Sequence, residues 1–430
     1  MIENVVTQQI VADILSVSKA TLKSWEASGK LRPLYEEQGK SFYRLSDLDD
    51  FEPVRRILNS RWREESLIRP SRVFTSVELF AGAGGLALGL ENAGFHHLLV
   101  NEIDRDACKT LRYNRNTWNI VESSVHTLNL TKYKNIDLIS GGFPCQAFSY
   151  AGKKLGFEDT RGTLFFEFAR LIKEAQPKLF LGENVRGLAS HDDGRTIKSI
   201  CSILDDLGYE IVPPQILKAI FYRVPQKRER LFIVGIRRDL SDQASFTWPS
   251  PYHRIVTLRD ALKAGELYAS DAPASSGQVY PCRKREILSY VPPGGYWRDL
   301  PDKLQREYMK KSYFLGGGKT GMARRLSWHE PSLTLTCSPA QKQTERCHPE
   351  ETRPLTVREY ARIQTFPDDW GFMGSLSSQY RQIGNAVPVN LALAVGRKLV
   401  DFLNSFYATQ ADIDIAADSI QLTNCQTTGG

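Results

Sequence analysis

The sequence contains few cysteines, and their arrangement would not stabilise a secreted fold. Seven cysteines are scattered over 430 residues, without a Cys-x-x-Cys pair. This scarcity argues against a disulfide framework and a structural zinc site, and it favours a reducing cytoplasm. The nearest approach to a metal-binding cluster is Cys337, Cys347 and His348, whose spacing fits no usual zinc pattern. We therefore expect no metal.

Long apolar runs are also missing. No uninterrupted apolar stretch reaches the length that spans a bilayer, and the N-terminus has no signal-peptide pattern. The chain has 41% hydrophobic and 24% charged residues, which is typical of a soluble globular protein, and its length suits two or three domains. We expect a cytoplasmic protein without a membrane partner.

Over most of the chain neither charge is in large excess. The formal net charge is +7, and between Arg254 and Arg346 there are 16 Lys and Arg against 9 Asp and Glu. The net charge of this one segment therefore equals the net charge of the whole chain. Aromatic residues such as Trp297 and Trp328 lie among these cations. Although charged segments are usually only solvated faces, this combination suits contact with a nucleic-acid backbone.

Residues 1–70 are expected to form a separate small domain. The pattern predicts a helix over 10–15, a turn with a serine N-cap at 16–18, a second helix over 19–27 and a hairpin over 35–43. This order resembles the winged helix-turn-helix of MerR-type regulators, whose second helix enters a DNA groove. The alternative is a small helical cap that only packs on the main domain.

From residue 74 the pattern alternates between strand and helix, which predicts an α/β domain on a mostly parallel sheet. A strand over 76–80 is followed by a glycine turn at 81–85, a helix, and a second strand that ends at Asn101 and Glu102. An acidic residue about 20 positions beyond a glycine turn is typical of a nucleoside site, with its carboxylate on the ribose hydroxyls. Any tight strand-to-helix turn can also use such glycines.

Further strands carry residues suited to chemistry. Cys145 follows a short apolar strand on a Gly-Gly-Phe-Pro turn, Glu183 ends another strand, and Arg228 and Arg230 lie in a Gln-Lys-Arg-Glu-Arg run. Ligands of open parallel sheets bind at the carboxyl ends of the strands, so Glu102, Cys145 and Glu183 can face one crevice. Taken singly, each has a structural alternative, namely a buried thiol, a helix N-cap or edge-strand charges.

The chemistry-bearing segments follow one another in a fixed order: Phe-Ala-Gly-Ala-Gly-Gly (80–85), Asn-Glu (101–102), Pro-Cys-Gln (144–146), Glu-Asn-Val (183–185), Gln-Lys-Arg-Glu-Arg (226–230) and Gly-Asn-Ala-Val-Pro (384–388). In sequence, order and approximate spacing, the chain resembles the bacterial DNA cytosine-5 methyltransferases over residues 74 to about 405. The resemblance implies an α/β, Rossmann-like fold with S-adenosylmethionine as methyl donor.

The pattern along the chain and these two resemblances together divide it into domains. Residues 1–70 would be the helix-turn-helix domain, 73–240 the first part of the catalytic domain, 241–352 an irregular, β-rich target recognition domain and 353–407 the closing part of the catalytic domain. The polar residues 408–430 are expected to be disordered.

Roles follow from the resemblance residue by residue. Cys145 matches the nucleophile that adds to carbon 6 of a flipped-out cytosine, and Glu183 the carboxyl group that acts at N3. Arg228 and Arg230 match residues that hold the base and support the loop. The loop at 146–163 is the expected lid. The implied cofactor-binding residues are Phe80, Gly82, Gly84, Glu102, Ile103, Ser124 and Asn385, and the implied substrate contacts are Pro144, Gln146, Asn184, Thr334 and Leu335.

One position departs from the family pattern. Ser124 stands where the family commonly has an acidic residue that contacts the adenine amino group, so the adenine contact stays open. The sequence lacks the Asp/Asn/Ser-Pro-Pro-aromatic motif of exocyclic amino methyltransferases.

The implied function is therefore methylation of carbon 5 of a cytosine in a specific duplex site. We expect a monomer on DNA that protects host DNA from a partner restriction endonuclease. A tRNA cytosine-5 methyltransferase, and a DNA-binding autoregulator acting through residues 1–70, are the alternatives.

Overall fold

A seven-stranded sheet with strand order β6-β5-β4-β7-β8-β11-β9 forms the centre of the molecule. The structure is a computed structural model that describes residues 5–37, 39–144, 164–242 and 244–427. Neighbouring strands are parallel from β6 to β8, whereas β11 runs antiparallel to both β8 and β9. The mostly parallel sheet expected from the sequence is confirmed. The strands are β4 (Phe74–Leu79), β5 (Phe95–Glu102), β6 (Ile120–Glu122), β7 (Leu138–Gly141), β8 (Leu179–Val185), β9 (Tyr209–Lys218) and β11 (Glu229–Arg237).

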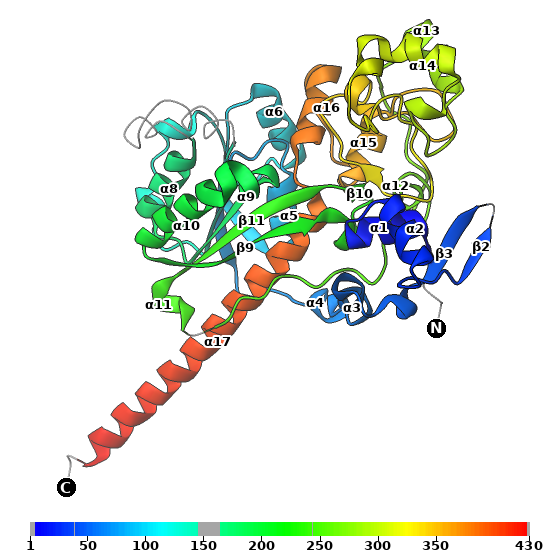
Figure 1. The fold of residues 1–430 in the computed structure, drawn as a ribbon. Coiled ribbons are helices and arrows are strands. Elements are labelled where there is room, and N and C mark those ends of the chain that lie inside the picture. Colours follow the sequence, from blue (N-terminus) through cyan, green and yellow to red (C-terminus); the bar gives the residue numbers. More distant parts are fainter. Residues whose placement is uncertain (1–4, 38, 145–163, 243, 428–430) are drawn as a thin grey trace.

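Helices cover both faces of this sheet (Figure 1). Alternate residues of a strand point to opposite faces, and β8 shows the consequence. Leu179 and Leu181 pack in a core with α5 (Gly85–Ala93) and α17 (Val389–Thr427). Phe180, between them, packs in a second core with α8 (Leu164–Ala175) and α10 (Arg195–Asp206). Both faces are apolar, as expected for a parallel sheet.

The end of the chain packs back onto its beginning. Helix α17 lies against α5 so closely that a Cβ on Gly89 would stand 2.3 Å from the Cβ of Ala392. Two helices lead into α17, namely α15 (Val357–Ile363), which Thr356 caps, and α16 (Leu376–Asn385). The segments before and after residues 241–352 therefore form one domain.

The recognition segment, residues 241–352, is not β-rich, and this expectation was wrong. It is irregular, but its regular elements are mainly short helices, including α12 (Leu258–Leu262), α13 (Cys282–Ser289) and α14 (Asp302–Met309). Within the described part of this segment, β12 (Ser332–Leu333) is the only strand, and it pairs with β10 (Gln226–Lys227). Prolines precede α13 and α14, where their fixed φ suits a helix start.

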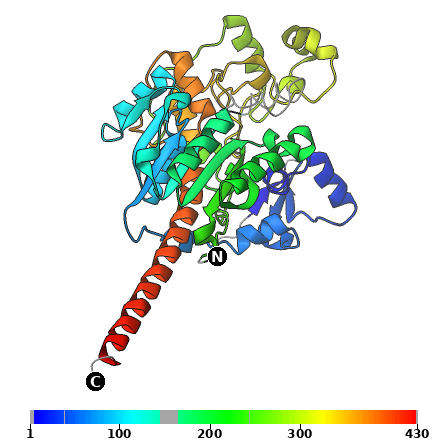
Figure 2. The same cartoon turned by 90° about the vertical axis from the view of Figure 1, so that its left-hand side faces the viewer.

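The expectation of a disordered tail also differs from the structure. Helix α17 continues to Thr427 and projects away from the body of the molecule (Figures 1 and 2). Residues 408–427 contain no glycine or proline, and they include four Ala, three Gln and three Ile, so no strong helix breaker lies there. The polarity that suggested disorder does not oppose helix formation.

The N-terminal module, residues 5–65, has the elements that the sequence predicts. Its helices are α1 (Gln8–Leu15), α2 (Lys19–Ala27), α3 (Glu52–Leu58) and α4 (Trp62–Glu65), and its strands β1 (Val5–Thr7), β2 (Tyr35–Glu37) and β3 (Lys40–Arg44) form a sheet of order β1-β3-β2. Ser18 caps α2 by accepting from the Thr21 amide at 3.0 Å. The likeness to MerR-type regulators stays a prediction.

No helix within the described ranges is long and apolar enough to cross a membrane.

Candidate active site

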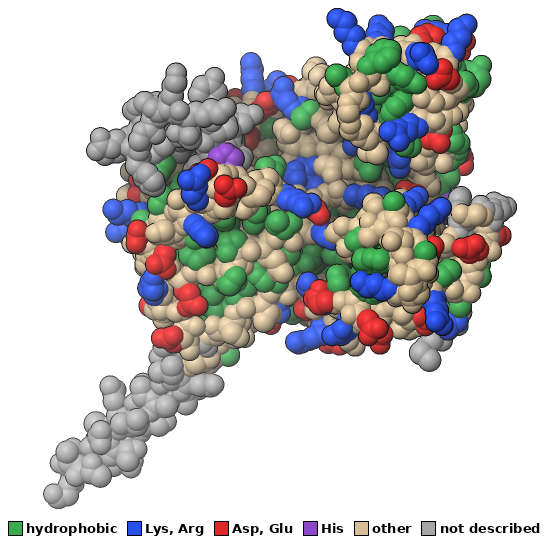
Figure 3. All heavy atoms as spheres, viewed as in Figure 1, with side chains coloured by type: hydrophobic (Ala, Val, Ile, Leu, Met, Phe, Trp, Pro, Cys, Tyr) green, Lys and Arg blue, Asp and Glu red, His purple; other side chains and the backbone are tan. Residues whose placement is uncertain are grey.

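The candidate site lies at the edge of the sheet formed by the carboxyl ends of the parallel strands. It lies at β4, where the strand order reverses, because β5 is on one side of β4 and β7 is on the other. Strand β4 lies between β5 and β7, so the turns that follow β4 and β7 leave the sheet side by side, which is where open α/β sheets bind ligands. Figure 3 shows a hollow between the sheet domain and the recognition segment, with Lys and Arg side chains around it. Cys145, Gln146 and the expected lid at 146–163 lie outside the described residues.

The turn that leads to Cys145 is fixed by three contacts. The Asn184 side-chain amide donates to the carbonyl oxygen of Phe143 at 2.7 Å. Phe143 is buried and packs against the rings of Phe165 and Phe168, both with centroids 5.5 Å away. A Cβ on Gly142 would stand 2.7 Å from Glu183 Oε2, so the turn needs glycine to pass the carboxyl group. The exposed Pro144 follows. Asn184 thus holds the turn, and its expected substrate contact stays a prediction.

Glu183 lies at the end of β8 and is paired with an arginine. Its Oε1 is 2.8 Å from Arg230 Nε, and the two side chains are only 12% and 13% exposed. Burial raises the pKa of Glu183, while the charges of Arg230 and Arg228 oppose the shift. A carboxyl group whose pKa is raised in this way can keep a proton closer to neutral pH and donate it.

Arg228 lies near this pair, and its side-chain hydrogen bonds to the described residues all go to backbone carbonyl oxygens. It is 1% exposed, and its guanidinium donates to the carbonyl oxygens of Leu335 (3.3 Å), Gly384 (3.0 Å) and Asn385 (3.2 Å). Burial lowers its pKa to about 9. Arg228 therefore joins the recognition segment to the last sequence motif, and its expected contact with the base stays a prediction.

The Thr334-Leu335 pair lies against the same run of residues. Thr334 Oγ1 donates to the carbonyl oxygen of Lys227 at 2.6 Å, and the amide of the buried Leu335 donates to Gln226 Oε1 at 3.0 Å. These contacts attach the recognition segment to β10. The sequence analysis did not assign a role to Gln226. Its place in the same motif as Arg228 and Arg230 could have indicated one.

The turn after β4 fits a nucleoside cofactor. Phe80 and Gly82 both have φ of 56° and Gly84 has φ of 87°, so the backbone is tightly coiled there. Glu102 Oε2 accepts from the Gly82 amide at 2.7 Å, while its Oε1 accepts from the Ile103 amide at 2.8 Å. The space in front of Gly82 is open to 4 Å, and Ile103 is 69% exposed. Oε2 retains a lone pair for a ribose hydroxyl.

The two serines after β6 differ in their bonding. Ser124 Oγ accepts from the His126 amide at 3.4 Å, so it serves as a local cap. Ser123 Oγ is buried and has no hydrogen-bond partner among the described residues, and the Ser123 amide donates to the Glu102 carbonyl at 3.2 Å. Asn385 is exposed, and its Oδ1 accepts from Cys337 Sγ at 3.3 Å. An unpaired hydroxyl beside Glu102 suits a polar ligand.

A buried carboxyl group that the sequence analysis overlooked lies near Glu183. Glu78 on β4 is 1% exposed and accepts a hydrogen bond from Ser140 Oγ on β7. Burial raises its pKa to about 8, and the negative charge of Glu183 adds to the shift. The available signal was a carboxylate inside an apolar strand, between Val77 and Leu79.

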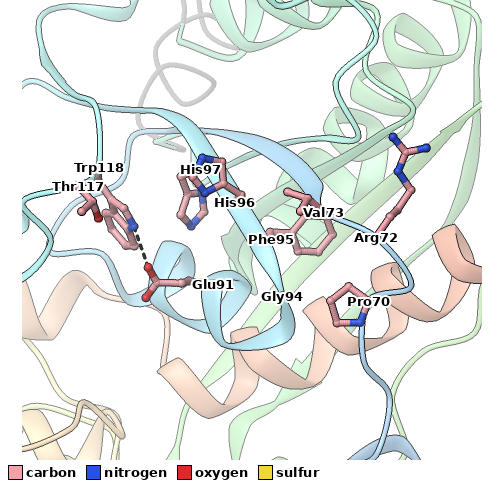
Figure 4. Close-up of a pocket in the computed structure, with 10 residues that line it drawn as sticks. All are labelled: Pro70, Arg72, Val73, Glu91, Gly94, Phe95, His96, His97, Thr117 and Trp118. Atoms are coloured by element: carbon pink, nitrogen blue, oxygen red, sulfur yellow. Dashed lines mark hydrogen bonds between the residues drawn. The ribbon is translucent and has the colours of Figure 1, made fainter.

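A cavity of about 580 Å³ lies at the opposite edge of the sheet (Figure 4). Its walls include the chain just before β4 and the first residues of β5, and Trp118 Nε1 donates to Glu91 there at 2.9 Å. Because it opens at the amino ends of the strands, it is separate from the crevice that holds Glu102 and Glu183. Its lining residues are Pro70, Arg72, Val73, Glu91, Gly94, Phe95, His96, His97, Thr117 and Trp118.

Within the described part of the chain, no group of three His, Cys, Asp or Glu side chains is arranged to hold a metal ion.

Comparisons with known proteins agree with this geometry. Residues 74–401 match the model of the C-5 cytosine-specific DNA methylase family. The chain is 64% identical over 396 residues to the type II methyltransferase M.Eco47II of Escherichia coli, covering 92% of this chain and 95% of that protein. It is 60% identical over 405 residues to the type II methyltransferase M.PspPI of a Psychrobacter strain, covering 94% and 97%.

These alignments also reach into the N-terminal module. The 396 aligned residues exceed what lies between residue 74 and the end of the chain, so part of the similarity must precede residue 74. Among solved structures, a prophage-encoded protein of E. coli, described as a DNA modification methyltransferase, has a TM-score of 0.56 and 26% identity, covering 77% of this chain and 99% of that protein.

Proposed function

The chain belongs to the family of C-5 cytosine-specific DNA methylases, and from that premise we propose how its residues carry out methyl transfer. It is an enzyme that methylates carbon 5 of cytosine in DNA. The substrate is a cytosine in a specific duplex site, and a covalent adduct with Cys145 is the intermediate. The observation that carries this proposal is the close approach of the turn before Cys145 to Glu183, where a Cβ on Gly142 would stand 2.7 Å from Glu183 Oε2.

Cys145 supplies the nucleophile. Its thiolate forms a bond to carbon 6 of the cytosine, and the electron pair of the C5–C6 double bond moves into the ring, which makes carbon 5 nucleophilic. Once carbon 5 carries the methyl group, a base removes the proton on that carbon, the electron pair of the C5–H bond re-forms the C5–C6 double bond as the C6–S bond breaks, and N3 returns its proton to the Glu183 carboxylate. The thiolate is released unchanged, so the cysteine is not consumed.

Glu183 neutralises the negative charge that the addition of the thiolate places on the cytosine ring. In its protonated form it donates to N3 as the thiolate adds, and Arg230, 2.8 Å away, stabilises the carboxylate that remains. The hydrogen bond from the Asn184 side chain to the Phe143 carbonyl oxygen holds the turn before Cys145 beside this acid. A cytosine inside a duplex hides carbon 6, so the target base must leave the helix to reach these groups.

S-adenosylmethionine is the methyl donor that this site fits. When bound, it supplies an electrophilic methyl group. The turn over Phe80, Gly82 and Gly84 allows its close approach, Glu102 accepts from the ribose hydroxyls, and Ile103 offers an apolar surface to the adenine. The unpaired hydroxyl of Ser123 is a candidate contact for the adenine in place of the family's acidic residue.

The DNA lies in the hollow between the sheet domain and the recognition segment (Figure 3). The excess of Lys and Arg in the segment from Arg254 to Arg346 supports contact with phosphates, so binding weakens as salt rises. Because the relatives are named type II methyltransferases, we propose that the enzyme protects host DNA from a partner restriction endonuclease and acts as a monomer in the bacterial cytoplasm.

Bisulfite sequencing tests the proposal. The chain is expressed in a host without cytosine-5 methylation, and the genome is sequenced beside that of a host expressing Cys145→Ser. A single short motif with protected cytosines, absent from the variant, is the expected result. Soluble wild-type protein that protects no cytosine in DNA contradicts the proposal, and protected cytosines in tRNA alone would assign the enzyme an RNA substrate.

A further inference from the structure

The N-terminal module is packed firmly on the catalytic domain. Glu65 accepts hydrogen bonds from the Ser250 amide and hydroxyl, both at 3.0 Å. The rings of Trp62 and Tyr252 meet edge to face with centroids 5.3 Å apart. The hydrophobic core of the module also includes Ile220 and Ile255 of the main body. Such shared burial fixes the module in one orientation.

An ion pair joins the module to the Gln-Lys-Arg-Glu-Arg run. Lys227 Nζ is 2.7 Å from Asp13 Oδ2 on α1, and the two side chains are 19% and 13% exposed. On its other side Lys227 Nζ is 3.9 Å from Glu330 of the recognition segment, and Glu330 is 3.8 Å from Arg324. Lys227 therefore stands between one carboxylate of the N-terminal module and one of the recognition segment.

The backbone of Lys227 continues this junction into the active site. Its carbonyl oxygen accepts from Thr334 Oγ1 at 2.6 Å, and the next residue, Arg228, binds the carbonyl oxygens of Leu335 and Asn385. A displacement of Lys227 would therefore move both Thr334, which follows β12 in the recognition segment, and the buried Arg228. Asp13 also accepts from Gln9 Nε2 at 2.9 Å, which fixes its carboxylate toward Lys227.

We propose that Asp13 is a positioning residue for methyl transfer, and that the N-terminal module braces the DNA cleft through the Asp13–Lys227 ion pair. The expected effect on enzyme kinetics rests on the proposed function, because it requires that the protein methylates DNA. Without Asp13, the one carboxylate among the described residues that remains within 4.0 Å of Lys227 Nζ is that of Glu330, at 3.9 Å, and the recognition segment loses a fixed link to the module. The two relatives share part of this region, as expected if the module serves the enzyme.

This role differs from that of an independent regulator. A regulator that binds DNA through its own helices needs no ion pair with the catalytic domain, and removing one would leave methylation unchanged. A brace predicts the opposite, because its effect passes through Lys227 to the surface that receives DNA. The expected change is a higher KM for DNA with little change in kcat, since no reacting group is altered.

The experiment is a double-mutant cycle in the full chain with Asp13→Asn and Lys227→Met. Each single variant raises the KM for duplex DNA about tenfold, and the double variant is no worse than either, because both remove the same interaction. Asp13→Glu restores most of the loss. Glu52→Gln is the matched control, since Glu52 forms an exposed ion pair with Arg56, 3.7 Å away, in the same module.

Hydrogen exchange supplies a readout that does not depend on activity. Asp13→Asn should speed amide exchange at 226–227 and 332–335 several-fold, while Glu52→Gln leaves it unchanged. Unchanged KM and exchange in Asp13→Asn, or additive effects in the double variant, would overturn the proposal. Wild-type protein that methylates no DNA would refute the proposed function, and the exchange result would still decide whether the brace exists.

Discussion

Glu78 offers a quantitative test of how the fold controls the chemistry beside the catalytic turn. It is buried on β4 and accepts a hydrogen bond from Ser140. Burial raises its pKa from 4.5 to about 8, helped by the negative charge of Glu183. Between these two values the folded protein keeps a proton that the unfolded chain has released. The free energy of unfolding therefore decreases as pH rises through this interval.

The magnitude follows from the shift. One proton difference changes the free energy of unfolding by about 1.4 kcal/mol per pH unit, so the full interval corresponds to about 5 kcal/mol. This stabilisation is present below pH 4.5 and is lost once the pH exceeds about 8. Glu78→Gln replaces the acid with a neutral side chain of the same shape, which can still accept from Ser140 and which does not titrate.

Urea denaturation at several pH values checks the prediction. Between pH 5.5 and 8.5, stability should shift by about 3 kcal/mol in favour of Glu78→Gln relative to wild type, because only the wild type must release the buried proton. Ser140→Ala is the control. The Ser140 hydroxyl lowers the pKa of Glu78, so its removal extends the wild-type decrease to higher pH. Parallel stability curves for wild type and Glu78→Gln would refute the reasoning.

Three further predictions concern the site itself. Glu183→Gln should slow single-turnover methyl transfer about 100-fold and abolish the decline of the wild-type rate as pH rises through the raised pKa of Glu183; an unchanged pH profile would contradict its role as the acid. Arg228→Met should lower the free energy of unfolding by about 3–5 kcal/mol, because the buried carbonyl oxygens of Leu335 and Gly384 lose their donor, and a thermal melt like that of wild type would count against this. Gly84→Ala should weaken S-adenosylmethionine binding in calorimetry, because φ is 87° and the added Cβ would stand 2.8 Å from Leu111; unaltered affinity would show that the turn tolerates a side chain.

The location of the site could be predicted because it depends on local sequence and on sheet topology. The carboxyl ends of parallel strands share one edge, so Glu102 and Glu183 could be placed there from their positions after apolar runs alone. The glycine turn was equally readable, since Gly82 and Gly84 both adopt positive φ, a conformation that glycine accepts without strain.

Contacts between distant segments could not be read in the same way. The Asn184 side-chain amide donates to the Phe143 carbonyl oxygen, and the two residues are 41 positions apart in the sequence. The sequence around either residue gives no indication that it contacts the other. The helical recognition segment was misjudged because its prolines and glycines suggested broken strands, whereas Pro281 and Pro301 instead start helices. For the tail, polarity predicted disorder, whereas α17 extends to Thr427 and no glycine or proline lies in residues 408–427.

The Gln-Lys-Arg-Glu-Arg run shows how five residues can serve three parts of the molecule. Gln226 and Lys227 belong to β10 and Glu229 and Arg230 to β11, and between the two strands the Arg228 amide donates to the Gln226 carbonyl oxygen at 2.9 Å. On one side Gln226 and Arg228 are buried and Arg230 meets Glu183, so alternate residues bind the recognition segment and the catalytic acid. On the other side Lys227 meets Asp13, and Glu229 lies 2.6 Å from Arg186. The order of residue types in this run, and not only their charge, therefore decides which part of the molecule each side chain contacts.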